Sequence, residues 1–111
     1  MFEPLKLGNR VEMVFKSRSG DDDTVEYASQ ILDFTDEGIM CAMPIYEGHI
    51  VPLEKGKRFE GYFYSDNKIY RAMCSVVSRG KEEKLHVAEI KLDSALVRIQ
   101  RREYYLSLIH I

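Results

Sequence analysis

Apolar and polar residues alternate along much of the chain with a period of two. In residues 10–16, Val11, Met13 and Phe15 fall on one face, and Glu12 and Lys16 fall on the other. Successive side chains of a β-strand point to opposite faces, so this pattern predicts strands with one buried face. Strand-like segments also occur at residues 27–34, 39–43, 59–64, 69–78, 85–90 and 95–99.

Turn-forming residues separate these segments. Gly38 ends residues 35–38, where a short hairpin loop requires a residue with positive φ. Ser65, Asp66 and Asn67 tolerate left-handed geometry or bond to their own backbone, which predicts a second hairpin. The polar residues 16–24 predict an exposed loop tip.

About seven strands with frequent turn signals, and no helical stripe, predict an all-β fold. We expect a small antiparallel barrel of six to seven strands. With 111 residues the chain fits one domain. Its 16 basic and 18 acidic residues leave a net charge of −2, which argues against a DNA-binding or membrane-surface protein.

The start of the chain lacks a signal peptide, and no apolar run reaches the length of a membrane span. We therefore expect a cytoplasmic protein without membrane insertion. Cys41 and Cys74 lie in apolar segments and are predicted to be buried thiols rather than a disulfide.

Residues with catalytic or metal-binding chemistry are sparse. His49, His86 and His110 have no Cys or carboxylate at metal-ligand spacing, so no metal site is predicted. Residues 21–23 are three aspartates, but they lack the spaced oxygen ligands and closing Glu of a calcium loop. There is neither a Gly-rich phosphate loop nor a nucleophile with its base, so we expect no enzyme and no cofactor.

The aromatic hairpin allows two interpretations. Tyr62, Phe63, Tyr64 and Tyr70, with Arg71 beside them, could stack single-stranded nucleic acid. Acidic residues counter the nearby cations, however, and such a surface needs a positive groove. Cross-strand aromatic pairing that fixes the register is the favoured interpretation.

The arginine-rich end of the last strand stands out. Three arginines, Arg98, Arg101 and Arg102, fall within five residues, and Tyr104 and Tyr105 follow. Arginine binds phosphate oxygens bidentately and can pair with guanine. Along a strand, arginines four apart line one face at a spacing of about 13 Å. This suits a compact ligand with phosphates and guanines, although a solubilising basic edge is the alternative.

The sequence Gln100-Arg101-Arg102-Glu103-Tyr104-Tyr105 resembles the start of the Q-R-R-x-x-x-R stretch that opens a PilZ domain in YcgR-like proteins. The preceding chain is similar to the domain that comes before it in that family. The similar positions are Leu7-Gly8, residues 27–33, Pro44 with Gly48, Leu53 with Gly56, Phe63, Tyr70 and Val76-Val77.

The resemblance covers nearly the whole chain, about residues 5–105, and it implies a function. YcgR-like flagellar brakes are non-catalytic receptors for cyclic-di-GMP. Their arginine motif clamps the nucleotide together with a D/N-x-S-x-x-G motif in a second barrel. The liganded receptor then acts on the stator or rotor switch of the flagellar motor. By resemblance, Gln100, Arg101 and Arg102 are the ligand-binding residues, and the protein is cytoplasmic, at the flagellar basal body.

Two departures from the family pattern are clear. Leu106 stands where the second motif arginine belongs, and the PilZ barrel does not follow. Residues 33–38 imitate the D-x-S-x-x-G motif but lie upstream of the arginines, so they are better explained as a strand end and a turn.

The last six residues, 106–111, match codon for codon the translation of a transposon adapter used in sequencing libraries. We therefore expect a barrel domain at residues 1–99, a linker with the start of the arginine motif at 100–105, and an adapter-derived tail at 106–111. Two other functions stay open: a flavin-binding split-barrel oxidoreductase and a single-stranded nucleic-acid-binding barrel.

Overall fold

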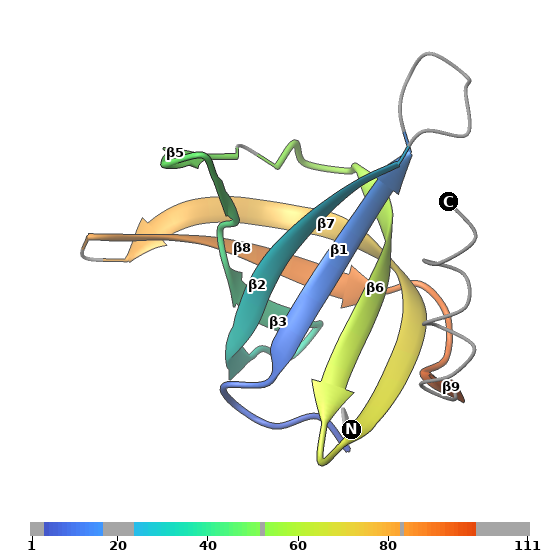
Figure 1. The fold of residues 1–111 in the computed structure, drawn as a ribbon. Coiled ribbons are helices and arrows are strands. Elements are labelled where there is room, and N and C mark those ends of the chain that lie inside the picture. Colours follow the sequence, from blue (N-terminus) through green and yellow to red (C-terminus); the bar gives the residue numbers. More distant parts are fainter. Residues whose placement is uncertain (1–3, 17–23, 52, 83, 100–111) are drawn as a thin grey trace.

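The alternating segments form strands that curve into a barrel in the computed structural model (Figure 1). The structure describes residues 4–16, 24–51, 53–82 and 84–99. In this part of the chain, the strands are β1 (Arg10–Lys16), β2 (Thr24–Phe34), β3 (Ile39–Ala42), β4 (Ile45–Tyr46), β5 (His49–Ile50), β6 (Arg58–Ser65), β7 (Lys68–Glu82), β8 (Leu85–Leu92) and β9 (Val97–Ile99).

Six of the strands close into an antiparallel ring. Their order is β6-β1-β2-β3-β8-β7, and the pairing of β6 with β7 closes the ring. β9 adds to β7 outside the ring, and β4 and β5 form a separate hairpin. The predicted all-β barrel of six to seven strands is therefore confirmed.

Two strands carry irregularities that help the sheet to curve. The register of β2 against β3 shifts between Ile31 and Asp33, and that of β7 against β8 shifts between Val76 and Ser78. Such bulges bend a strand and increase its twist. β7 has 15 residues, which lets its first half pair with β6 and its second half with β8.

The barrel interior is filled by the inward-facing residues that the alternation predicts. Val11, Met13 and Phe15 are buried in β1, and Phe63 is completely buried in β6. The core consists of Leu5, Val11, Met13, Phe15, Ile31, Ile39, Cys41, Met43, Leu53, Phe59, Phe63, Ala72, Cys74, Val76, Ala88 and Ile90. Because these side chains fill the interior, ligands or partners would contact the outer face or the ends of the barrel.

Both predicted hairpins exist, but their turns differ in detail from the prediction. Gly38 is buried and is not among the residues with positive φ, so its expected left-handed conformation is wrong. Ser65 still pairs with Lys68 as part of the ladder. The second turn therefore consists of Asp66 and Asn67 alone, both with positive φ, as in a two-residue type I′ hairpin.

The β4–β5 hairpin was not predicted. Its strands have two residues each, too few to show a period, and they are joined by Glu47 and Gly48 with φ of 51° and 80°. Several predicted strands are also longer or shorter at their ends than the observed β2, β7, β8 and β9.

In the described residues, no helix is long and apolar enough to cross a membrane. Most of the predicted loop tip lies outside these residues, since 17–23 are not described. The predicted linker at 100–105 and the predicted adapter-derived tail at 106–111 also lie outside them.

Candidate functional site

β9 is the last strand that the structure describes. It pairs antiparallel with the start of β7, so that Arg98 lies opposite Tyr70 and Ile99 lies opposite Ile69. Ile69 is only three residues from the β6–β7 turn at Asp66. The exit of the chain is therefore fixed beside that turn (Figure 1).

The predicted ligand-binding residues come next in the sequence. Gln100, Arg101 and Arg102 follow Ile99 directly, and they lie outside the described residues. The described structure thus sets the strand that leads into the arginine segment, whereas the role of these three side chains stays a prediction.

The corner between β8 and β9 is held by polar contacts with neighbouring strands. The Asp93 amide donates to the Met73 carbonyl at 2.7 Å, and the Met73 amide donates to Ser94 Oγ at 2.8 Å. Ser75 Oγ donates to Asp93 Oδ1 at 3.3 Å, and Arg58 Nε lies 3.8 Å from Asp93 Oδ2. These contacts direct the chain along β7 rather than away from it.

The outer face beside the exit carries a tyrosine held by a carboxylate. Tyr62 donates its hydroxyl to Glu60 at 3.0 Å, and Arg71 Nη1 lies 4.0 Å from the other oxygen of Glu60. Partial burial, and then the hydrogen bond and negative charge of Glu60, raise the pKa of Tyr62 to about 12. At neutral pH, Tyr62 is therefore a neutral donor.

A second tyrosine on this face is held in the same way. Tyr64 on β6 donates its hydroxyl to Glu12 on β1, and the Arg10 guanidinium lies 5.9 Å from the centre of the Tyr64 ring. Both tyrosines are half-buried.

These contacts disfavour the nucleic-acid interpretation of the aromatic hairpin. Phe63 lies inside the barrel opposite Tyr70, as expected for cross-strand pairing. Glu60 also lies within ion-pair distance of Arg71, the cation of the same hairpin. A surface that stacks single strands needs aromatic faces in a positive groove, and here carboxylates accompany the tyrosines.

The N-terminal segment contacts the turn next to the chain exit. Ser65 Oγ donates to the Pro4 carbonyl at 3.0 Å, and Lys6 Nζ lies 2.9 Å from Asp66 Oδ2. Both charged groups are exposed, so the ion pair adds little stability. The contacts nevertheless place the start of the described chain beside its end.

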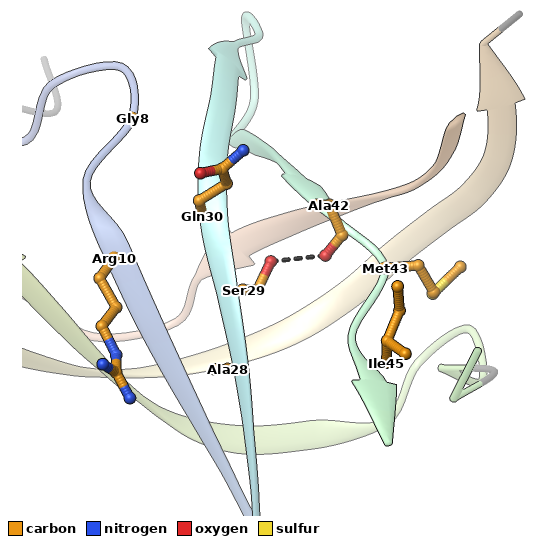
Figure 2. Close-up of a pocket in the computed structure, with 8 residues that line it drawn as sticks. All are labelled: Gly8, Arg10, Ala28, Ser29, Gln30, Ala42, Met43 and Ile45. Atoms are coloured by element: carbon orange, nitrogen blue, oxygen red, sulfur yellow. Dashed lines mark hydrogen bonds between the residues drawn. The ribbon is translucent and has the colours of Figure 1, made fainter. Parts of the chain in front are cut away.

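A surface depression of about 460 Å³ lies on another side of the barrel and extends across β2, from Gly8 and Arg10 on one side to the connection from β3 to β4 on the other (Figure 2). Ser29 Oγ on β2 donates to the Ala42 carbonyl across it. The depression is lined by Gly8, Arg10, Ala28, Ser29, Gln30, Ala42, Met43 and Ile45.

The sequence prediction did not find this depression. At its β3 side, the ladder between β2 and β3 begins only at Ile31, and alternation does not predict where such a ladder begins. One local signal was available, namely Glu47-Gly48 between two short apolar segments, which is typical of a tight hairpin beside the depression.

The described residues hold no cluster of His, Cys, Asp and Glu side chains that could bind a metal ion. Cys41 and Cys74 are free and completely buried, as predicted. Burial raises the pKa of both thiols, that of Cys41 to about 12. Buried neutral thiols of this kind are structural rather than reactive.

A comparison with protein families gives a match over most of the barrel. The family model described as "Flagellar protein YcgR" matches residues 6–92. The chain belongs to this YcgR family.

A solved structure shares the fold of this YcgR-family domain. It is the Bacillus subtilis inhibitor of motility, MotI/DgrA, with a TM-score of 0.71 and 18% sequence identity. The alignment covers 89% of this chain and 48% of the MotI/DgrA chain. The YcgR-family domain thus spans about half the length of that structure. No curated protein matches the chain.

Family membership and fold confirm the resemblance that the sequence showed. The matched residues begin at Lys6 and end at Leu92, so they include all six strands of the closed ring. β9 and the arginine segment lie beyond the matched residues. The YcgR-family assignment therefore rests on the barrel and not on the arginines.

Proposed function

We propose that this chain is a non-catalytic regulatory domain of a cyclic-di-GMP receptor that controls flagellar motility in the manner of a flagellar brake. The observation that carries the proposal is the YcgR family match at residues 6–92, followed within a few residues by Gln100-Arg101-Arg102. The fold shared with a motility inhibitor, MotI/DgrA, supports the same general role.

Arg101 and Arg102 supply the chemistry that this ligand requires. Each guanidinium offers a planar fork of donors that matches two phosphate oxygens, or the O6 and N7 acceptors of guanine. Gln100 adds an amide that both donates and accepts. Because β9 is paired with β7 up to Ile99, this segment starts from a fixed position on the barrel.

In the proposed receptor, these residues form one side of the nucleotide site, and a second barrel supplies the other side. The partners are then cyclic-di-GMP and a stator or rotor-switch component of the flagellar motor, and the protein acts in the cytoplasm at the basal body. The chain has Leu106 in place of the second motif arginine, and it lacks the second barrel's motif. We therefore expect the 111-residue chain alone to bind cyclic-di-GMP negligibly.

Calorimetry with cyclic-di-GMP tests the proposal on two proteins. The 111-residue chain should show no measurable heat of binding. If residues 106–111 derive from an adapter, a protein in which the natural sequence continues after Tyr105 into the second barrel should bind. In that longer protein, Arg102→Ala should weaken binding roughly tenfold to a hundredfold, since a charge-assisted hydrogen bond contributes about 1.5–3 kcal/mol.

Arg79→Ala is the matched control. Arg79 is an exposed arginine in the half of β7 that pairs with β8, away from β9, and its replacement should leave the affinity unchanged. Micromolar binding by the 111-residue chain, or equal effects of Arg79→Ala and Arg102→Ala, would contradict the proposal.

A further inference from the structure

A row that contains two cations crosses three neighbouring strands on the outside of the barrel. Arg58 on β6 lies opposite Ser75 on β7, and Ser75 lies opposite Lys91 on β8. Directly paired residues share one face of a sheet, and the inward face here belongs to the buried neighbours Cys74 and Ile90. The two cations therefore lie on the outer face, with their backbones about 10 Å apart, which is two strand spacings.

One carboxylate lies close to both cations. Asp93 Oδ2 lies 3.8 Å from Arg58 Nε, and Asp93 Oδ1 lies 4.0 Å from Lys91 Nζ. The Asp93 side chain is only 16% exposed, and Ser75 Oγ donates to Asp93 Oδ1 at 3.3 Å, so the carboxylate is held against β7. The side chains of Arg58 and Lys91 are 72% and 54% exposed. A single, mostly covered carboxylate therefore balances only one of two exposed positive charges.

A third cation comes from the connection between β5 and β6. Lys55 is exposed and lies in a turn that is fixed to β7 by two backbone hydrogen bonds. The Gly56 amide donates to the Val76 carbonyl at 2.7 Å, and the Val76 amide donates to the Lys57 carbonyl at 2.9 Å. Gly56 has φ of 87°, the left-handed conformation that glycine tolerates best. The position of Lys55 relative to the row is therefore set by the backbone.

The three cations line a hollow of about 470 Å³ in the surface. We call it the basic hollow, and its lining consists of Glu37, Lys55, Gly56, Arg58, Ser75, Val76, Val77, Lys91 and Asp93. Glu37, on the turn before β3, is exposed and is the second carboxylate of this set. Three positive and two negative side chains leave the basic hollow with a surplus of positive charge.

We propose that the basic hollow binds an acidic segment of a partner protein. Its exposed cations are distributed over three strands and a turn, so they match carboxylates spread along a polypeptide. Like charges brought close together on neighbouring strands lower the stability of a sheet, and a negatively charged partner removes that repulsion. The segment should place its carboxylates near Lys55, Arg58 and Lys91.

The geometry disfavours other anions. A compact phosphate site uses free backbone amides, and here the amides of Gly56 and Lys57 already donate to the carbonyls of Val76 and Glu54. A nucleic acid carries a dense row of phosphates, which Glu37 and Asp93 would repel. The carboxylates of a protein segment can be spaced to avoid both residues.

The basic hollow is independent of the proposed nucleotide site. Arg58 is the first residue of β6, and Ser65, which contacts the N-terminal segment beside the chain exit, is the last. A strand of this length places its two ends about 23 Å apart. The inference therefore stands or falls separately from the role of the arginine segment.

Fluorescein-labelled hexaglutamate, measured by fluorescence anisotropy with the 111-residue chain, tests the proposal. The peptide should bind at an ionic strength of about 0.02 M, and binding should weaken about tenfold at about 0.2 M because salt screens exposed charges. Lys55→Gln and Lys91→Gln each remove one cation and should each weaken binding about threefold. Glu37→Gln removes a repelling carboxylate and should strengthen binding about twofold.

Lys81→Gln is the matched control. Lys81 is an exposed lysine near the tip of the β7–β8 hairpin, where it lies opposite His86. Its replacement changes the net charge by the same amount as Lys55→Gln and should leave the affinity unchanged. In an NMR titration, the peptide should shift the amide signals of Gly56 and Lys91 and leave that of Lys81 in place.

Three results would overturn the proposal. The first is no binding of hexaglutamate at low ionic strength. The second is an equal loss of affinity in Lys81→Gln and Lys55→Gln, which would show attraction to the whole chain rather than to the basic hollow. The third is tighter binding of a single-stranded oligothymidylate than of hexaglutamate, with the oligothymidylate weakened by the same substitutions, because the basic hollow would then be a nucleic-acid site.

Discussion

Gly38 packs directly against the backbone of Ile90. A Cβ added to Gly38 would lie 1.9 Å from the carbonyl oxygen of Ile90, far inside van der Waals contact. Gly38 ends the turn between β2 and β3, and Ile90 lies on β8, the next strand of the ring. The turn before β3 can therefore pack this closely against β8 only because residue 38 is a glycine and has no side chain.

Gly38→Ala should destabilise the barrel. The new methyl group forces the turn away from β8, and such overpacking lowers the free energy of unfolding by about 3 kcal/mol. Urea denaturation measures the change. Gly80→Ala is the control, because a Cβ there meets nothing within 4 Å, and its effect should stay within about 0.5 kcal/mol. Equal effects of the two substitutions would contradict the close packing.

Gly38 also shows where sequence reasoning stops. The position of the turn was predictable because Gly follows three polar or turn-forming residues. The reason for the glycine was not, since it depends on a strand far along the sequence. The inward faces of β1 and β6 were predictable because each alternates over seven or eight residues, which is long enough for the period to show.

The two candidate sites were predictable to different degrees. The arginine segment is visible in the sequence because arginines cluster where packing does not require them. The depression across β2 is not, because it depends on where the ladder between β2 and β3 begins, and nothing in the alternation of residues 24–34 marks that point.

Asn67 should tolerate glycine but not valine. Its φ is 65°, and the preceding Asp66 has φ of 51°, the left-handed conformation that a type I′ turn requires. Asn67→Gly should keep or slightly raise the stability, whereas Asn67→Val should lower it by about 1 kcal/mol because a β-branched residue is strained there. Chemical denaturation of both variants measures this.

Lys68→Val controls for the change in side chain, since Lys68 is exposed and lies in the regular part of β7. It should be close to neutral. If Asn67→Val proved as harmless as Lys68→Val, the two-residue turn would be wrong.

Ionisation of Tyr62 should lower the free energy of unfolding at strongly alkaline pH. Its pKa is raised from 10.0 to about 12, first by burial and then by Glu60, so folding favours the protonated form. The resulting stabilisation is fully present below pH 10, and it is lost as the pH rises through about 12. Absorbance titration of the phenolate, as a difference between the unaltered chain and Tyr62→Phe, isolates this group from the buried thiols.

The carboxylate contribution can be separated from burial. Glu60→Gln removes the negative charge next to Tyr62 and should move its pKa part of the way back towards 10.0, while burial keeps it above that value. The difference titration of the unaltered chain against Tyr62→Phe gives the pKa of Tyr62. An ordinary tyrosine pKa in that titration would show that Tyr62 does not make the observed contacts.

Cys41 and Cys74 should resist alkylation until the barrel opens. Both side chains are completely buried on neighbouring parts of the core, and burial raises the pKa of each thiol. The thiolate is the reactive form, so a native thiol must become both exposed and ionised before it reacts. With an ordinary free energy of unfolding, labelling at mild alkaline pH should be slowed about a thousandfold relative to the chain in urea. Ser78→Cys introduces an exposed thiol on β7, and it should react at once under the same conditions. Mass spectrometry of the labelled peptides assigns each site.

The contradicting outcome would be labelling of Cys41 as fast as that of the cysteine in Ser78→Cys. It would mean that β3 does not close the barrel between β2 and β8.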